Sequence, residues 1–464
     1  MSVSPDPLDA PAPATFDDER KLIFSPATLP CGRVVKNRLA KASMYENMAD
    51  FPGGPPTPEL LRLYELWAIG GWGIILTGNV QISTRHRGLG RDLLLNARAP
   101  SKREHELYTA MADGMKRAKQ PEGEAPPLVL MQINHAGRQS PNFLGGRWPW
   151  QRPLAPSPRR VGEGTTEGIA ARIFYRLLWQ TPQAMTLANI EDVKNEFIQA
   201  ALFAQECNYD GVQVHAAHGY MLAQFLSPAT NSRTDKYKDG VLIVKEICTA
   251  IRAAVKSSFV VGVKLNAVDY TSGGLTEELA LEHVKTLAAC GIDFIEVSGG
   301  SYEAPAFTEK ASPRQAFFAN FSRAAHAAIS TMPPSKRPLV MLTGGLRTSS
   351  DIARCLRAPH ADIAGLARPA AIDPAYPRHM DKTPAEMPDM VSPKWFPKLV
   401  IGNIGTAWHC DAMRAWAIGK PVQFDTTSLG LLMGMFIGPA WKTQIVGVLV
   451  ILAALKGYSA QWHL

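Results

Sequence analysis

Short apolar, β-branched runs alternate with longer amphipathic segments along most of the chain. The apolar runs predict strands at residues 38–42, 73–77, 128–134, 211–214, 260–265, 294–297, 339–342 and 361–366. The segments between them show helical periodicity and predict helices at residues 58–69, 102–117, 190–205, 241–255, 277–290, 315–329 and 349–356. Eight strands with seven intervening helices predict an α/β fold, a (β/α)8 TIM barrel, with a doubly wound open sheet as the alternative.

Three segments depart from this alternation. Residues 1–20 are rich in Pro, Ala and Asp and predict a flexible tail, with ordered structure beginning near Phe24. Residues 138–187 form a long insertion between the third and fourth strands, and we expect it to cap the barrel mouth. The chain therefore divides into the tail, a barrel over residues 21–395, and a hydrophobic C-terminal extension over residues 396–464.

The C-terminal extension contains a long apolar segment. Residues 429–455 are 27 residues with one charge, Lys442, and one proline, Pro439. A membrane-spanning helix needs about 20 apolar residues, and a lysine at its centre costs roughly 2.5–3.5 kcal/mol. Each half on either side of Lys442 is too short to span a bilayer. The segment therefore predicts either membrane association or a tail that docks on the barrel or forms a homodimer contact.

Composition restricts the class of protein. The chain has 464 residues, 46% of them hydrophobic, enough for a sizeable core. Its net charge is +8, but Lys and Arg are scattered, which argues against a nucleic-acid partner. The six cysteines contain no Cys-x-x-Cys pair, so we expect no zinc or iron–sulfur site. No apolar leader follows the N-terminus, so we expect a cytoplasmic protein with reduced thiols.

The stretch HAAHGYMLAQFLSPATNSRTDKY, residues 215–237, carries the strongest chemical signal. It follows a predicted strand and presents His215, His218 and Tyr220 at the strand's carboxyl end. Two imidazole N–H groups suit a carbonyl oxygen on which negative charge accumulates, and a phenol with a pKa of about 10 suits protonation of a carbanion. A purely structural histidine pair is the alternative. A zinc site is less favoured, because no cysteine or carboxylate pair stands nearby in sequence.

Other strand ends offer groups for a planar, phosphorylated cofactor. Gly78 follows the second strand and lets a flat ring approach the backbone, while the Gln132 carboxamide both donates and accepts, as a pyrimidine-like edge requires. Small residues and one arginine follow the last three strands, where barrels commonly bind phosphate. These residues are Ser298, Gly299, Gly344, Gly345, Ala367 and Arg368.

Residues 215–237 resemble the Old Yellow Enzyme family of flavin-dependent ene-reductases. That family's fourth strand ends in His-x-x-His/Asn-Gly-Tyr and continues into Gln-Phe-Leu-Ser-Pro and Asn-x-Arg-Thr-Asp-x-Tyr, and the resemblance spans about residues 24–377. It implies an FMN enzyme that uses NAD(P)H to reduce the C=C bond of an α,β-unsaturated carbonyl compound. His215 and His218 would hold the carbonyl oxygen, flavin N5 would deliver hydride to the β-carbon, and Tyr220 would protonate the α-carbon.

The same resemblance implies the FMN contacts. The ring would lie against Ser43, Met44, Tyr45, Gly78 and Gln132, and the phosphate against the small residues and the arginine after strands six to eight. The family's Gly-Gly-Ser-x-x-Asn-Arg continuation is absent after Tyr237, which leaves Lys264 or Lys238 to supply a cation at the flavin. Because of this departure, a redox-neutral isomerase or cyclase of a biosynthetic pathway, and a non-catalytic membrane-associated barrel with a vestigial site, stay open as alternatives.

Overall fold

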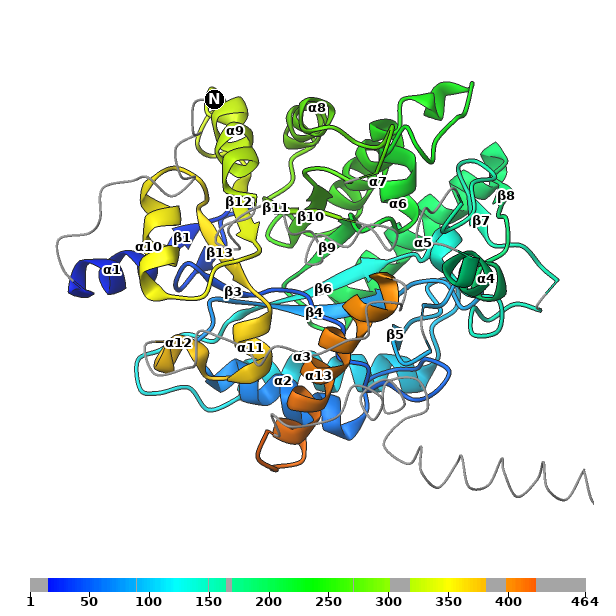
Figure 1. Ribbon diagram of the computed structural model, residues 1–464. Helices are drawn as coiled ribbons and strands as arrows, with labels where there is room; N and C mark the ends of the chain where they lie inside the picture. The colour runs from blue at the N-terminus through cyan, green and yellow to red at the C-terminus, as the bar shows by residue number, and fades with distance from the viewer. Residues whose placement is uncertain are drawn as a thin grey trace, which may run out of the picture.

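A computed structural model describes residues 16–88, 90–148, 150–163, 169–269, 271–300, 318–380 and 398–422 of the chain (Figure 1). Its centre is a ring of parallel strands in which β3 pairs with both β4 and β13 and so closes the ring. The ring strands are β3 (Leu39–Lys41), β4 (Ile74–Gln81), β6 (Leu128–Asn134), β9 (Gly211–Ala216), β10 (Val260–Asn266), β11 (Phe294–Ser298), β12 (Leu339–Thr343) and β13 (Ile363–Leu366). The predicted (β/α)8 barrel is confirmed, and the open sheet is wrong.

The helices that follow these strands surround the barrel. They are α2 (Pro58–Ile69), α3 (Lys102–Arg117), α5 (Leu187–Glu206), α7 (Val241–Ala254), α8 (Glu277–Ala288), α9 (Ala319–Ile329) and α10 (Ser349–Arg357). Several begin at a Ser or Thr whose hydroxyl accepts a backbone N–H of the first turn, as Thr57, Ser101 and Thr186 do. Such local signals explain why α2 and α3 have the bounds that the sequence predicted.

Short elements complete the described fold. They are β1 (Ala27–Thr28), β2 (Val34–Val35), β5 (Leu93–Leu94), η1 (Gly137–Gln139), β7 (Leu154–Ala155), α4 (Ile169–Leu178), β8 (Gln183–Ala184), α6 (Met221–Leu226), η2 (Lys236–Lys238), α11 (Arg368–Ile372) and α12 (Tyr376–His379). Leu29 and Val35 of the β1–β2 hairpin pack with the apolar lower interior of the barrel, which includes Leu130, Phe294 and Met341. This apolar layer lies below the polar groups of the candidate site.

The N-terminal prediction needs a correction. The sequence predicts a flexible tail over residues 1–20, but residues 16–20 belong to helix α1 (Phe16–Ile23), which packs beside α10 (Figure 1). Ile23 is fully buried, and the Ser350 hydroxyl donates to Glu19 Oε1 at 2.9 Å. The sequence read alone missed these long-range contacts, which hold a short polar helix in place. The first 15 residues lie outside the described part of the chain.

The insertion after the third barrel strand reaches the segment that follows the fourth strand. It contains η1, the paired strands β7 and β8, and α4, on the right of the barrel in Figure 1. Gln139 donates from Nε2 to the carbonyl of His218 at 2.9 Å. Trp179 is buried and donates from Nε1 to the Gln139 carbonyl at 2.8 Å. The insertion therefore contacts the His218 loop directly.

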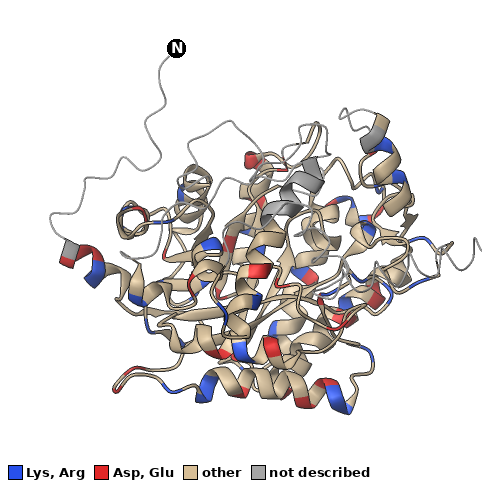
Figure 2. Cartoon of the chain, turned by 60° about the horizontal axis from the view of Figure 1, so that its bottom comes forward, with Lys and Arg blue, Asp and Glu red and all other residues tan. Residues whose placement is uncertain are grey.

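The C-terminal extension begins with a helix that lies against the barrel. Helix α13 (Lys398–Ala417) contacts both α2 and α11, beside which it runs in Figure 1. The apolar segment over residues 429–455 lies outside the described residues. Within those described, no helix is long and apolar enough to cross a membrane. Basic and acidic positions are interspersed along the helices in the view of Figure 2.

Candidate functional site

A buried ion pair forms the floor of the candidate site. Strand alternation and register place Lys264 of β10 beside His215 of β9 on one side and Glu296 of β11 on the other. Lys264 Nζ lies 2.9 Å from Glu296 Oε1, and the two side chains are 4% and 0% exposed. Gln213 donates from Nε2 to Glu296 Oε2 at 2.6 Å. Lys264 therefore points into the barrel, where it is ion-paired with Glu296, whereas Lys238 is exposed.

The three residues of the motif meet above this floor. The ring centroids of His215 and His218 are 5.1 Å apart, and those of His215 and Tyr220 are 4.9 Å apart. His215 Nδ1 accepts the backbone N–H of Ala217 at 3.2 Å, so the proton of the neutral ring is on Nε2. Burial, followed by the charge of Lys264, holds the pKa of His218 well below its usual range, and burial does the same for His215. Both imidazoles are neutral near pH 7.

His218 is fixed by its backbone and its ring. It adopts a left-handed conformation with φ of +57°, and its N–H donates to Asn266 Oδ1 at 3.0 Å. Its Nε2 lies 2.8 Å from the hydroxyl of Ser298. The sequence predicts Ser298 on the phosphate side, and the structure places its hydroxyl on His218. The second imidazole is thus oriented by groups at the ends of the next two strands along the chain, β10 and β11.

Asn79 connects two of the predicted site residues. Its Nδ2 donates to the Tyr220 hydroxyl at 3.1 Å, and its Oδ1 accepts a short hydrogen bond from Gln132 Nε2. Sequence reasoning missed Asn79, although it follows Gly78 at a strand end where site residues gather. Gln132 Oε1 is buried and has no hydrogen-bond partner among the described residues. An unpaired acceptor of this kind fits an N–H donor on the edge of a flavin ring.

The loop after β3 carries Ser43, Met44 and Tyr45, and hydrogen bonds from the C-terminal helix α13 hold it in place. The Cys410 thiol of α13 donates to the Tyr45 carbonyl at 3.0 Å. Arg414 Nη2 donates to the carbonyl of Asn47 at 3.1 Å, where the backbone has a φ of +55°. The loop predicted to contact the ring is therefore positioned by residues from the other end of the chain.

A second buried ion pair lies between this loop and Gly78. The Glu46 carboxylate accepts from the Tyr64 hydroxyl at 2.5 Å and lies 3.4 Å from Lys41 Nζ. Burial, partly offset by Glu46, lowers the pKa of Lys41 to about 8. A side chain at Gly78 would place its Cβ 1.9 Å from Glu46 Oε2. Glycine is required there because the carboxylate packs against the backbone.

The predicted phosphate side gathers at the ends of β11, β12 and β13. Gly344 and Gly345 have φ values of +130° and +78°, a backbone conformation that favours glycine. The Thr343 hydroxyl is buried and has no hydrogen-bond partner within the part of the chain that the structure describes. Ala367 caps α11, and Arg368 is its first residue. These groups and Gln132 Oε1 fit the polar groups of FMN.

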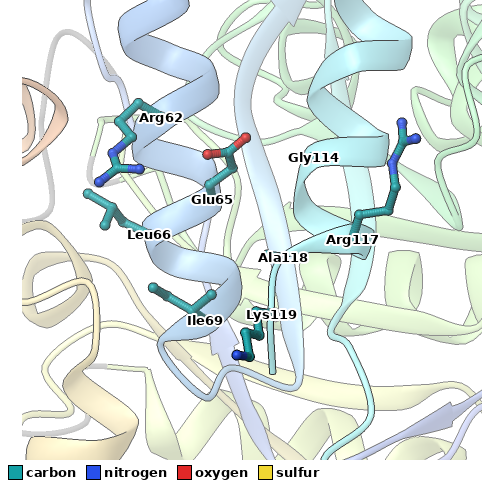
Figure 3. A pocket seen from close by; sticks show the side chains of 8 residues that line it. All are labelled: Arg62, Glu65, Leu66, Ile69, Gly114, Arg117, Ala118 and Lys119. Carbon is teal, nitrogen blue, oxygen red and sulfur yellow. The ribbon is translucent and has the colours of Figure 1, made fainter. Parts of the chain in front are cut away.

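A surface groove of about 420 Å³ lies elsewhere, between the outer helices α2 and α3 (Figure 3). Its lining carries charges of both signs and comes from residues Arg62, Glu65, Leu66, Ile69, Gly114, Arg117, Ala118 and Lys119. None of these residues belongs to the strand ends that build the candidate site. The groove plays no part in the chemistry described above.

Comparison with known proteins gives matches over most of the chain. Residues 22–386 match the model of the NADH:flavin oxidoreductase / NADH oxidase family. The NADH-dependent flavin oxidoreductase iccE of Talaromyces variabilis is 32% identical over 429 residues, which are 85% of this chain and 95% of that protein. The NADH-dependent flavin oxidoreductase iliE of a Neonectria species is 36% identical over 76% of this chain, which spans 46% of that protein.

Two solved structures share the fold at low sequence identity. The Old Yellow Enzyme homologue of Zymomonas mobilis has a TM-score of 0.62 and 21% identity, with 81% of this chain and 98% of that chain covered. Morphinone reductase has a TM-score of 0.61 and 18% identity, with 79% and 91% covered.

Fold and site together define a flavin-dependent barrel oxidoreductase. The chain belongs to the NADH:flavin oxidoreductase / NADH oxidase family and, as the sequence predicted, resembles Old Yellow Enzyme. FMN is the cofactor of this family and NAD(P)H is the reductant.

Proposed function

We propose that the protein reduces the C=C bond of an α,β-unsaturated carbonyl compound. The observation that carries this proposal is the meeting of His215, His218 and Tyr220 at the carboxyl ends of the strands, with ring centroids about 5 Å apart. When bound, the reduced flavin supplies a hydride to the β-carbon. The three side chains supply what that transfer needs in addition, which is a polarised carbonyl and a proton.

The two imidazoles hold the substrate carbonyl in this proposal. His215 carries its proton on Nε2, because Nδ1 accepts the Ala217 N–H. Both rings stay neutral because burial lowers their pKa values. Neutral N–H donors held in place in a dry site stabilise the negative charge that develops on the carbonyl oxygen during hydride addition.

Tyr220 donates the proton to the α-carbon. Its ring packs edge-on against His215 with an interplanar angle of 67°, and its hydroxyl accepts from Asn79. Lys264 supplies a cation beneath the imidazoles, and Glu296 balances that charge at 2.9 Å. Gln132, with its unpaired Oε1, would hold the pyrimidine edge of the flavin, and Thr343 and Arg368 would hold the phosphate end.

The test separates the two half-reactions. Tyr220→Phe should slow reoxidation of the reduced enzyme by 2-cyclohexenone by about 100-fold or more, because a positioned general acid contributes on the order of 10²–10⁴. Flavin reduction by NADH should stay within about twofold of the wild type. Equal loss in both half-reactions, measured by anaerobic stopped-flow absorbance, contradicts the role given to Tyr220.

The same groups can also polarise and protonate a substrate without net hydride transfer. A redox-neutral isomerase or cyclase would use His215 and His218 as carbonyl donors and Tyr220 as the acid. Analysis of products with and without NADH distinguishes the two functions. A product isomeric with the substrate, formed without consumption of NADH, would replace the reductase proposal.

A further inference from the structure

Asn79 lies between two residues for which the proposed function has separate roles. It stands opposite Gln132 in the register of β4 and β6, just after a register shift in β4 between Leu76 and Asn79. Its amide nitrogen donates to the Tyr220 hydroxyl at 3.1 Å, and its amide oxygen accepts from Gln132 Nε2. Tyr220 is 141 residues away in sequence, so closure of the barrel creates this contact.

The direction of these two hydrogen bonds matters chemically. Because Gln132 occupies the amide oxygen of Asn79, the amide nitrogen is turned toward Tyr220. An N–H donor directed at a phenol oxygen stabilises the negative charge that remains when the phenol gives up its proton. Asn79 thus favours Tyr220 as an acid.

We propose that Asn79 is a positioning residue that orients Tyr220 for proton transfer and couples it to Gln132 on the flavin side. This inference rests on the proposed function, which gives Tyr220 the role of proton donor. Asn79 touches neither the reacting carbon nor the transferred hydride in this scheme. It acts by fixing the hydroxyl of Tyr220 and the carboxamide of Gln132 in one hydrogen-bonded chain.

The groups around Tyr220 allow its ionisation to be followed in a pH profile. His215, on β9, packs against the phenol and is neutral because burial lowers its pKa. Lys264 and Glu296, the buried charges of the barrel floor, neutralise each other. His218, beside His215, is also neutral because burial lowers its pKa, and we expect substitution of Asn79 to change the ionisation of Tyr220 because the amide donor is lost.

Two substitutions separate the two contacts of Asn79. Asn79→Asp keeps an oxygen that accepts from Gln132, but it replaces the N–H that faces Tyr220 with a carboxylate oxygen, whose negative charge also disfavours ionisation of the phenol. Asn79→Ala loses both contacts. We expect both variants of the holoenzyme to slow reoxidation by 2-cyclohexenone about five- to tenfold, the effect of one hydrogen bond, and to move the alkaline limb of that rate to higher pH. Only Asn79→Ala should weaken FMN binding, by a similar factor.

A matched control comes from the pair of β4 and β6 residues two positions further along, Gln81 and Asn134. Asn134 is a buried amide that donates to Gln81 Oε1 at 3.1 Å. Asn134→Ala should leave the pH profile of reoxidation unchanged, and thermal unfolding of every variant reports whether the barrel is intact. Ultraviolet difference absorbance between each variant and its Tyr220→Phe counterpart gives the ionisation of Tyr220 without using the reaction.

The outcomes distinguish this inference from the proposed function. If Asn79→Asp folds normally and keeps the wild-type rate, pH profile and Tyr220 ionisation, the positioning role is wrong. The same conclusion follows if Asn134→Ala shows the same changes as Asn79→Ala. If Tyr220→Phe itself leaves reoxidation unchanged, then the proposed proton donor is wrong, and the Asn79 inference falls with it.

Discussion

Glu296→Gln tests the buried charge at the floor of the site with a substitution that hardly changes volume. Glu296 Oε1 lies 2.9 Å from Lys264 Nζ, and Oε2 accepts from Gln213 at 2.6 Å. A glutamine there can accept from Gln213 only by turning its own NH2 group toward the ammonium. The variant therefore removes the counter-ion of Lys264 and leaves two hydrogen-bond donors, the new NH2 group and the ammonium, facing each other.

The expected loss of stability is large. Both side chains are at most 4% exposed, and removing one partner of a buried ion pair costs about 3–5 kcal/mol. That is a large fraction of the roughly 5–15 kcal/mol that stabilises a folded protein. Lys264→Met should cost a comparable amount, since it leaves the carboxylate unpaired. The double variant should cost less than the sum of the two, because the introduced glutamine then keeps the bond from Gln213 without opposing an ammonium.

Urea unfolding of the four proteins, saturated with FMN and stripped of it, measures these free energies. A coupling of about 2 kcal/mol or more between the two sites is expected. Glu296→Gln should also raise the reduction potential of bound FMN, because a negative charge has been removed near the anionic reduced ring. Single variants within about 1 kcal/mol of the wild type, with additive effects in the double variant, would refute the argument.

Two further predictions use other parts of the structure. Burial, followed by the charges of Arg147 and Arg98, lowers the pKa of His135 to about 3. The contribution of the neutral imidazole to folding stability is therefore fully present above pH 6.5 and is lost as the pH falls. The stability advantage of the wild type over His135→Gln in urea unfolding should thus shrink by about 1.4 kcal/mol between pH 7.5 and 5.5, and a constant difference contradicts this. Arg414→Ala removes the donor to the Asn47 carbonyl in the loop after β3, and we expect it to raise the FMN dissociation constant about fivefold in a fluorescence titration. Trp416→Phe loses a hydrogen bond to a carbonyl outside that loop and should leave the dissociation constant unchanged.

The candidate catalytic motif was predictable because its parts are close together in sequence. His215, His218 and Tyr220 fall within six residues, and a strand that ends at Ala216 delivers all three to the same end of the barrel. The alternation of strands and helices was equally local, since the apolar periodicity of each segment is read within a few turns. The resemblance to Old Yellow Enzyme then supplied roles for these residues, which the experiments above test.

The neighbours of the motif could not be predicted in the same way. Nothing near Lys264 in sequence indicates that Glu296 neutralises it, because the pair forms only when β10 and β11 lie side by side. The contact of Asn79 with Tyr220 joins residues 141 positions apart, and the contact of Cys410 with the Tyr45 carbonyl joins residues 365 apart. The hydroxyl of Ser298, a residue that the sequence predicts on the phosphate side, bonds to His218, and nothing in its own segment indicates that contact.

The sequence by itself determined the barrel, its order of strands and the three chemical groups at the end of the fourth one, because each depends on residues within one segment. Only the tertiary structure decided the electrostatic and hydrogen-bonding surroundings of those groups. The charge balance of Lys264, the orientation of Tyr220 and the support of the Tyr45 loop by α13 all come from chain segments that meet when the ring of strands closes.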